Sequence, residues 1–327
     1  MRAFRNDSRT WTMAQRGALV AAFTAALAVP GWTQAAVDCG MSPAFEQKDG
    51  NAKGGRTAVW ADAQNQALMF IDGLNVNTDG TRRSYSVSDF WGERVALNNL
   101  CNAMSDACAG LGKAGLQARR ELVQQAAAQG WPAEMWKRSK LSADIIPLKN
   151  GKPCPEVDGF LVSATALRKP GVSDACDLTA YADALVTPAL VLPKGPKRGQ
   201  PSEFAQRGAR IGDLVVALRR DAMSPVFAVV GDSGPSDQLG EGSVALNGKL
   251  LGKTEPPLNY QELRGKGAFK GKAWTVPPTV VLIFPGSRNA ADPWLTPDRI
   301  DAAARERFEA WGGLARAQAC AAAYPRP

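Results

Sequence analysis

The chain has 327 residues, of which 45% are hydrophobic and 21% are charged, and it contains no histidine. This composition is typical of a globular protein and excludes the collagen-like, coiled-coil and disordered classes. The lack of histidine excludes Ser-His-Asp and Cys-His catalysis, and every acid–base step or metal site that uses imidazole. Acid–base chemistry near neutral pH must then come from carboxyl groups with raised pKa values, buried lysines or tyrosines.

Residues 1–35 are typical of a cleavable export signal. Arginines precede an apolar run at residues 17–30, and residues 33–35 form a small-residue cleavage site. The apolar run is shorter than the ~20 residues that span a bilayer, although an uncleaved anchor is the alternative. Asp38 directly before Cys39 argues against a lipid anchor. We therefore expect a secreted or periplasmic protein with no transmembrane segment in its mature chain.

The charge of the chain is mildly positive. The net charge is +8, and removal of the signal leaves 35 basic and 30 acidic residues, or +5. The basic residues are scattered rather than gathered into a stripe, so we expect no nucleic-acid partner. A basic surface favours either an acidic wall polymer or simple solubility.

All six cysteines lie beyond the signal, which indicates disulfides in an oxidising compartment. Many connectivities are possible for six cysteines. Local spacing favours three pairs: Cys101 with Cys108, Cys154 with Cys176 and, by remainder, Cys39 with Cys320. The competing interpretation is a metal site, but the sequence has no CxxC and no histidine. We expect neither a metal nor an organic cofactor.

The apolar pattern predicts strands first, then helices, then strands again. After an exposed lead-in at 38–56, strands are expected at 57–60 and 67–71, and helices at 97–104 and 114–128. Further strands are expected at 184–192, 213–218, 226–230, 243–246 and 279–284, before a helix from Pro297 to about Ala322. This order predicts an α+β fold, with an antiparallel sheet or small β-barrel core, a helical insert at about 88–145 and a C-terminal helix. We expect one domain over residues 36–327.

Two acidic residues beside glycines form the most informative motif. Gly231 places Asp232 at the end of an apolar strand, and Gly240 and Gly242 flank Glu241. Turn-forming residues between them allow the chain to double back, so the two carboxylates should face one cleft. Glycoside hydrolysis needs such a pair, and glycines would let a sugar approach the backbone closely. The structural alternative is a turn-capping aspartate and a solvated glutamate.

The segments at 212–218, 227–235 and 239–246 resemble the core of glycoside hydrolase family 75, the fungal-type chitosanases. In that family a Gly-Asp pair and a Gly-Glu pair carry the catalytic acids, which implies Asp232 and Glu241 here. The resemblance also implies an inverting mechanism, for which we assign Glu241 as general acid and Asp232 as base.

Two weaker matches extend the resemblance to about residues 57–286. Residues 74–80 resemble the family's Asp-x-Asp-x-Asp-Gly stretch, and residues 177–192 resemble its proline-centred strand. Asn75 and Asn77 replace the first two acids of that stretch, and the loop between the catalytic acids is shorter than in the fungal enzymes. We expect Asp79, Asn77 and Asp237 to bind substrate.

Three aromatic residues, Trp60, Trp91 and Tyr85, are candidates for stacking on sugar rings, with core packing as the alternative. Together these features predict an exported, monomeric, endo-acting hydrolase that cleaves β-1,4 linkages in a chitosan-like polysaccharide with two carboxylates. The alternatives are a non-catalytic carbohydrate-binding protein and a hydrolase of another cell-wall glycan.

Overall fold

The computed structural model describes residues 37–50, 52, 54–293 and 295–324, which belong to one compact unit. The predicted export signal lies outside these residues. The strands are β1 (Met41–Lys48), β2 (Arg56–Asp62), β3 (Leu68–Asn77), β4 (Leu148–Lys149), β5 (Lys152–Pro153), β6 (Ala189–Pro193), β7 (Leu214–Arg219), β8 (Pro225–Gly234), β9 (Glu241–Ser243) and β10 (Val276–Phe284).

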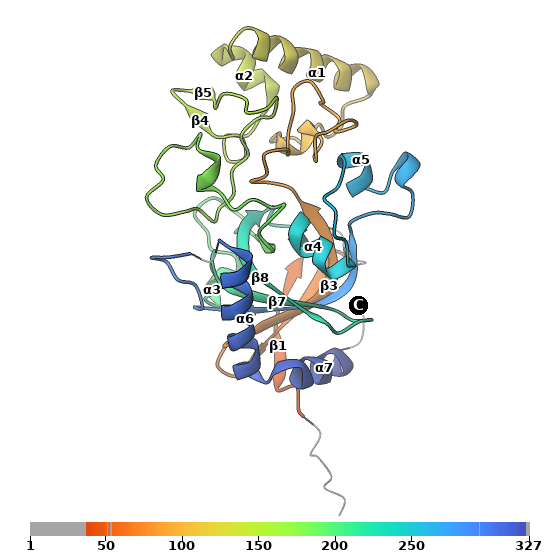
Figure 1. Ribbon diagram of the computed structural model, residues 1–327, viewed down its shortest axis with the longest axis vertical. Coiled ribbons are helices and arrows are strands. Elements are labelled where there is room, and N and C mark those ends of the chain that lie inside the picture. Colours follow the sequence, from red (N-terminus) through yellow and green to blue (C-terminus); the bar gives the residue numbers. More distant parts are fainter. Residues whose placement is uncertain (1–36, 51, 53, 294, 325–327) are drawn as a thin grey trace, which may run out of the picture. The chain divides into compact units, whose positions relative to one another are not determined.

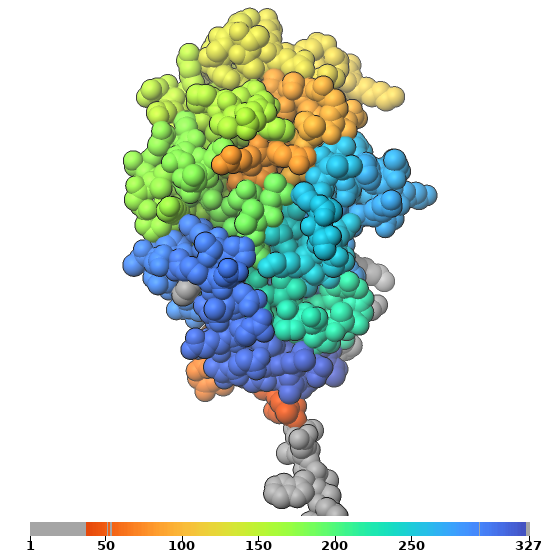
Figure 2. Space-filling model, viewed as in Figure 1, coloured from red at the N-terminus to blue at the C-terminus, as the bar shows by residue number. Residues whose placement is uncertain are grey.

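The helices are α1 (Lys113–Ala128), α2 (Ala133–Ser139), α3 (Glu203–Gln206), α4 (Val244–Leu251), α5 (Tyr260–Leu263), α6 (Pro297–Trp311) and α7 (Gly313–Ala323). Short 3-10 turns are present at Leu100–Ala103, Leu178–Ala180 and Gly267–Phe269. Helices α1 and α2 lie at the opposite end of this unit from α6 and α7 (Figures 1 and 2). Within the described chain, no helix has both the length and the apolar character needed to cross a membrane.

Six strands close into a barrel. Their order is β3-β10-β7-β8-β6-β9, and β9 pairs back onto β3, while β1 and β2 extend the sheet beyond β3. The β6–β8 and β3–β9 pairs are parallel, and the other pairs of the barrel are antiparallel. The predicted α+β fold with a small barrel core is therefore confirmed, and the predicted hairpin of β7 and β8 is present.

Successive side chains point to opposite faces of each strand, and this alternation produces two apolar layers. Val281 and Ile283 of β10 pack inside the barrel with Phe70 of β3. Their neighbour Phe284 faces the other way and packs with Phe308 of α6. Burial of each such side chain contributes ~1.5 to 3 kcal/mol, so the two layers hold the barrel and the C-terminal helices together.

The C-terminal segment begins at the expected helix start, with Pro297 in the first turn. It is not one helix, because Gly312 adopts a φ of 122° and separates α6 from α7. All three predicted disulfides are confirmed, and Cys39–Cys320 joins the chain before β1 to α7. Three disulfides are consistent with an oxidising, extracellular environment.

Four predicted elements differ from the structure. The lead-in at 38–56 is not wholly exposed loop, because β1 pairs there with β2. The strand expected at 184–192 begins only at Ala189, and the helix expected at 97–104 is a short 3-10 turn. The strand expected at 243–246 ends at Ser243, whose Oγ accepts a 3.1 Å hydrogen bond from the N–H of Leu246 and caps α4. The local apolar pattern does not predict these differences, because a helix cap or a partner strand far away in the sequence determines the structure there.

Candidate active site

Asp232 and Glu241 lie on two strands that share one neighbour. Val191 of β6 is the register partner of Asp232 on β8 and also of Glu241 on β9. The chain between the two acids therefore does not form the simple doubling back that the sequence suggested, since β6 lies between them. Register partners point to the same face of a sheet, and two inter-strand spacings place their backbones ~10 Å apart.

The Glu241 carboxyl reaches back across β6. A Cβ atom added to Gly234 of β8 would lie 3.7 Å from Oε2 of Glu241. Gly234 is two residues beyond Asp232 on the same strand, so the Glu241 carboxyl lies against the strand that carries Asp232. An inverting pair needs carboxyl groups ~6.5 to 9.5 Å apart, with room for a water molecule.

The glycines beside the acids allow close packing of the protein backbone. The register shifts between Leu190 and Val191, so Gly231 is an extra residue in β8, and a Cβ there would lie 2.6 Å from Cβ of Ala189. Gly240 has a φ of 72°, and a Cβ there would lie 2.3 Å from the carbonyl oxygen of Gly73. These glycines therefore permit the bulge and the turn that orient the acids, and the close approach of a sugar stays a prediction.

The acids line a cleft of about 730 Å³ between the barrel, the insert and α5. Asp79 and Asn77 line the same cleft, so the structure brings together four of the five site residues that the sequence predicted. The fifth, Asp237, is exposed and lies outside the cleft lining, and its backbone carbonyl accepts a 2.8 Å hydrogen bond from Gly50. Its position gives no support to a substrate-binding role.

Asp79 is half-buried and accepts hydrogen bonds from two hydroxyl groups. Ser163 Oγ lies 3.0 Å from its Oδ1, and the Tyr85 hydroxyl is the second donor. Burial raises the pKa of Asp79 to about 6, while the hydrogen bonds from Tyr85 and Ser163 and the charge of Lys194 oppose the rise. Asn77 shapes the turn, because its Oδ1 accepts a 2.7 Å hydrogen bond from the Asp79 N–H.

The carboxyl of Asp232 is held by backbone donors. The N–H groups of Ser233 and Ala166 lie 2.8 and 3.0 Å from its Oδ1. Burial, followed by the negative charge of Asp79, raises the pKa of Asp232 to about 7.

Glu241 has a higher pKa than Asp79 and Asp232. Burial raises it to about 8, with further contributions from the charges of Asp79 and Asp232. Within the described chain, no hydrogen-bond donor reaches its carboxyl group to favour the ionised form. Near neutral pH this group therefore carries a proton that it can donate.

A second pair of acids lies behind the Glu241 segment. Burial, then a hydrogen bond and the charge from Asp49, raises the pKa of Asp72 to about 8. Its buried Oδ2 atom receives no N–H or O–H donor from the described residues, and a Cβ on Gly240 would lie 3.0 Å from it. The raised pKa means that Asp72 carries a proton near neutral pH, as its hydrogen bond with Asp49 requires. The sequence analysis missed the pair because the two residues lie on different elements.

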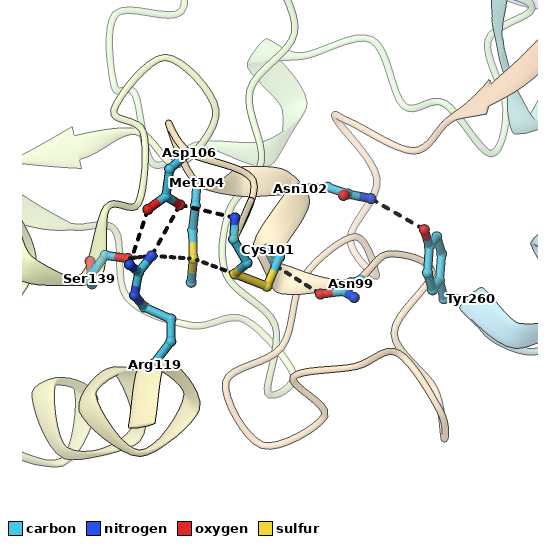
Figure 3. Close-up of a disulfide and its surroundings, with 9 residues drawn as sticks. Asn99, Cys101, Asn102, Met104, Asp106, Arg119, Ser139 and Tyr260 are labelled. Atoms are coloured by element: carbon cyan, nitrogen blue, oxygen red, sulfur yellow. Dashed lines mark hydrogen bonds and ion pairs between the residues drawn. A yellow bond between two sulfur atoms is a disulfide. The ribbon is translucent and has the colours of Figure 1, made fainter. Parts of the chain in front are cut away.

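The insert and α5 supply the opposite side of the cleft. Figure 3 shows Asn102, next to the Cys101–Cys108 disulfide, with its Nδ2 3.5 Å from the hydroxyl of Tyr260. Both residues line the cleft. They are 158 positions apart in the chain, so no local sequence signal links them.

The cleft also contains charged residues that the sequence analysis did not single out, namely Lys194, Arg264 and Asp144. Of the three aromatic candidates, Tyr85 lines the cleft. Trp60 instead stacks on Tyr324 with ring centroids 4.5 Å apart, and Trp91 packs against an apolar cluster of the insert.

The arrangement can transfer protons between carboxyl groups and a ligand. Among the described residues, no group of three or more histidine, cysteine, aspartate or glutamate side chains is placed to hold a metal ion. Comparison of the chain with protein-family models and with curated proteins finds no match. The site must therefore be interpreted from its geometry and from the motif resemblance alone.

Proposed function

We propose that this chain is an exported endo-acting glycoside hydrolase that cleaves β-1,4 linkages in a chitosan-like glucosamine polymer with inversion. The observation that carries the proposal is the placement of Asp232 and Glu241 on either side of Val191, with both carboxyl groups in one cleft. The resemblance of their Gly-Asp and Gly-Glu motifs to family 75 supports the same reaction.

The two acids take different roles. Glu241, whose pKa is about 8, donates its proton to the glycosidic oxygen as the bond from that oxygen to the anomeric carbon breaks. Asp232, whose pKa is about 7, removes a proton from a water molecule that attacks the opposite face of the anomeric carbon. The leaving chain gains a hydroxyl group, and the new reducing end has the α configuration.

The substrate assignment rests on the carboxyl groups of the cleft and the motif resemblance. The carboxyl groups that line the cleft would attract the ammonium groups of glucosamine, and Tyr260 offers an aromatic ring to a sugar face. Lys194 and Arg264 also line the cleft and reduce its negative charge. Residues 1–35 and the three disulfides support a secreted or periplasmic location.

The test is reducing-end release from chitosan by the mature chain, with peptidoglycan as the alternative polymer. Asp232→Asn and Glu241→Gln should each lower kcat by at least ~100-fold, because each removes a proton-transfer group. Asp237→Asn is the matched control, since this exposed carboxyl lies outside the cleft, and it should keep full activity. Circular dichroism would verify the fold of each variant.

Proton NMR of the first products would show whether the α-anomer forms. Chitosan inactivity of the folded wild type would reject the substrate, and binding without turnover would identify a carbohydrate-binding protein instead. Turnover that survives either cleft substitution would reject the assigned catalytic pair.

A further inference from the structure

Asp79 is the acidic residue whose charge acts on both members of the proposed catalytic pair. It makes the largest charge contribution to the electrostatics of Asp232 and of Glu241. A small second cavity, lined by Asp79 and Asp232 together, shows that these two residues are neighbours. Asp79 follows the end of β3 by two residues, β3 pairs with β9 at Glu241, and Asp79 and Glu241 line the same cleft, so Asp79 is close enough to influence the proton on Glu241.

The surroundings of Asp79 select its ionised form. The Oγ atom of Ser163 accepts a 3.3 Å hydrogen bond from the N–H of Gly80, which leaves the Ser163 proton for Asp79 at 3.0 Å. The Tyr85 oxygen accepts a 3.2 Å hydrogen bond from Nδ2 of Asn98, which leaves the phenolic proton for Asp79 in the same way. A carboxyl group that receives two such protons is stabilised as a carboxylate.

These donors are themselves fixed. Tyr85 is 1% exposed and Ser163 is fully buried. Asn98 also donates from Nδ2 to Thr78 Oγ1 at 3.0 Å, so its amide orientation is set by a second partner. Both residues are thus shielded from water, which favours their hydroxyl groups as donors to Asp79.

We propose that Asp79 is a positioning residue, a fixed negative charge that keeps Glu241 protonated so that it can act as the general acid. This role rests on the proposed glycosidase function. It differs from the substrate-binding role that the sequence suggested, because its target is a proton on the enzyme. The ionisable groups that face Asp79 are Asp232, Glu241, Tyr85 and Lys194.

Asp79 and Glu241 differ in the hydrogen-bond donors that reach their carboxyl groups. Asp79 has two hydroxyl donors, whereas within the described chain Glu241 has none. At a pH where only one of these two carboxyl groups is protonated, the proton therefore lies on Glu241 and the negative charge lies on Asp79. Lys194 reinforces this distribution because its positive charge acts on Asp79.

The experiment is a carboxyl-carbon NMR titration of the mature chain, with the Glu241 signal identified by its loss in Glu241→Gln. Asp79→Asn removes the charge and keeps the size, so the Glu241 midpoint should fall by about 1 pH unit. Asp144→Asn, at the insert side of the same cleft, is the control and should leave the midpoint unchanged. An unchanged midpoint in folded Asp79→Asn would overturn the proposal.

A second test uses the wild-type chain and therefore does not depend on whether a variant folds. With its signal assigned through bonds, Asp79 should titrate at lower pH than Glu241, and the reverse order would overturn the proposal. In activity assays, the alkaline limb of the kcat/KM profile of Asp79→Asn should move to lower pH with the NMR midpoint, whereas loss of a substrate contact would raise KM at every pH. Inactivity on chitosan with the titrations intact would reject the proposed function and leave the role of Asp79 supported.

Discussion

Replacement of Asp72 by asparagine should stabilise the folded chain increasingly as pH rises. In the folded state the pKa of Asp72 is raised from 3.8 to about 8, mainly by burial and then by Asp49. The unfolded chain releases this proton near pH 4, whereas the folded chain holds it up to about pH 8. The stability associated with the protonated group is therefore complete below pH 3.8 and is lost as pH rises toward 8.

The magnitude follows from the size of the shift. Each pKa unit corresponds to about 1.4 kcal/mol, so a shift of about four units gives a ceiling of ~5 to 6 kcal/mol. Asp72 is only half-buried, and screening by water reduces this to ~2 kcal/mol. Asparagine has nearly the same shape, cannot ionise, and can donate an N–H to Asp49. Asp72→Asn should therefore match wild type near pH 4 and exceed it by ~2 kcal/mol at pH 8.

Urea unfolding at pH 4 and pH 8, followed by far-ultraviolet circular dichroism, measures both differences. Asp237→Asn is the control, because it removes an exposed carboxyl from a nearby loop and should change stability equally little at both pH values. A gain for Asp72→Asn that is the same at both pH values, or a loss at pH 8, would refute the assignment of a buried, protonated Asp72.

Three other outcomes are expected. The kcat/KM profile on chitosan should be bell-shaped with its maximum between pH 7 and 8, rising as Asp232 ionises and falling as Glu241 ionises, and a maximum near pH 5 would contradict the assigned pair. Replacement of Cys39 and Cys320 by alanine should lower the unfolding free energy by ~5 to 6 kcal/mol in urea titrations, because the disulfide closes a separation of 281 residues, and a loss under 1 kcal/mol would refute the chain-entropy argument. Tyr260→Ala should raise KM for long oligomers ~5-fold or more with little change in kcat, whereas Tyr260→Phe should resemble wild type, and equal effects of the two variants would exclude ring stacking.

The sequence predicted those parts of the fold that depend on local pattern. The apolar strands and α1 were found from periodicity, and the Cys101–Cys108 pair was found from its short separation. It could not predict closure of the barrel, because β9 has only three residues and its pairing with β3 and β6 joins segments far apart in the chain. It also missed β1, whose apolar residues do not alternate regularly and which forms a strand because β2 lies beside it.

The candidate site shows the same division. The acids Asp232 and Glu241 could be selected because glycines and turn-forming residues surround them in the sequence. The donors that distinguish one carboxyl from another, such as Ser163 and Tyr85, could not be selected, because a serine or tyrosine has no special sequence context there. The spacing predicted that the two acids face one cleft, but the bulge at Gly231, which places Asp232 opposite Val191, is not encoded in any apolar pattern.

Strand β6, which lies between the two acids, makes the spacing of the acids independent of the choice of polymer in the proposed enzyme. The distance between the acids depends on the hydrogen-bonded ladder through Val191, whereas the ligand also meets residues of the insert and α5 that lie in other parts of the chain. Changes of length or sequence in the insert can therefore alter which polymer fits while the spacing of the acids stays constant. On the proposed mechanism, relatives with different inserts would cut different glycans and still release products of the same anomeric configuration.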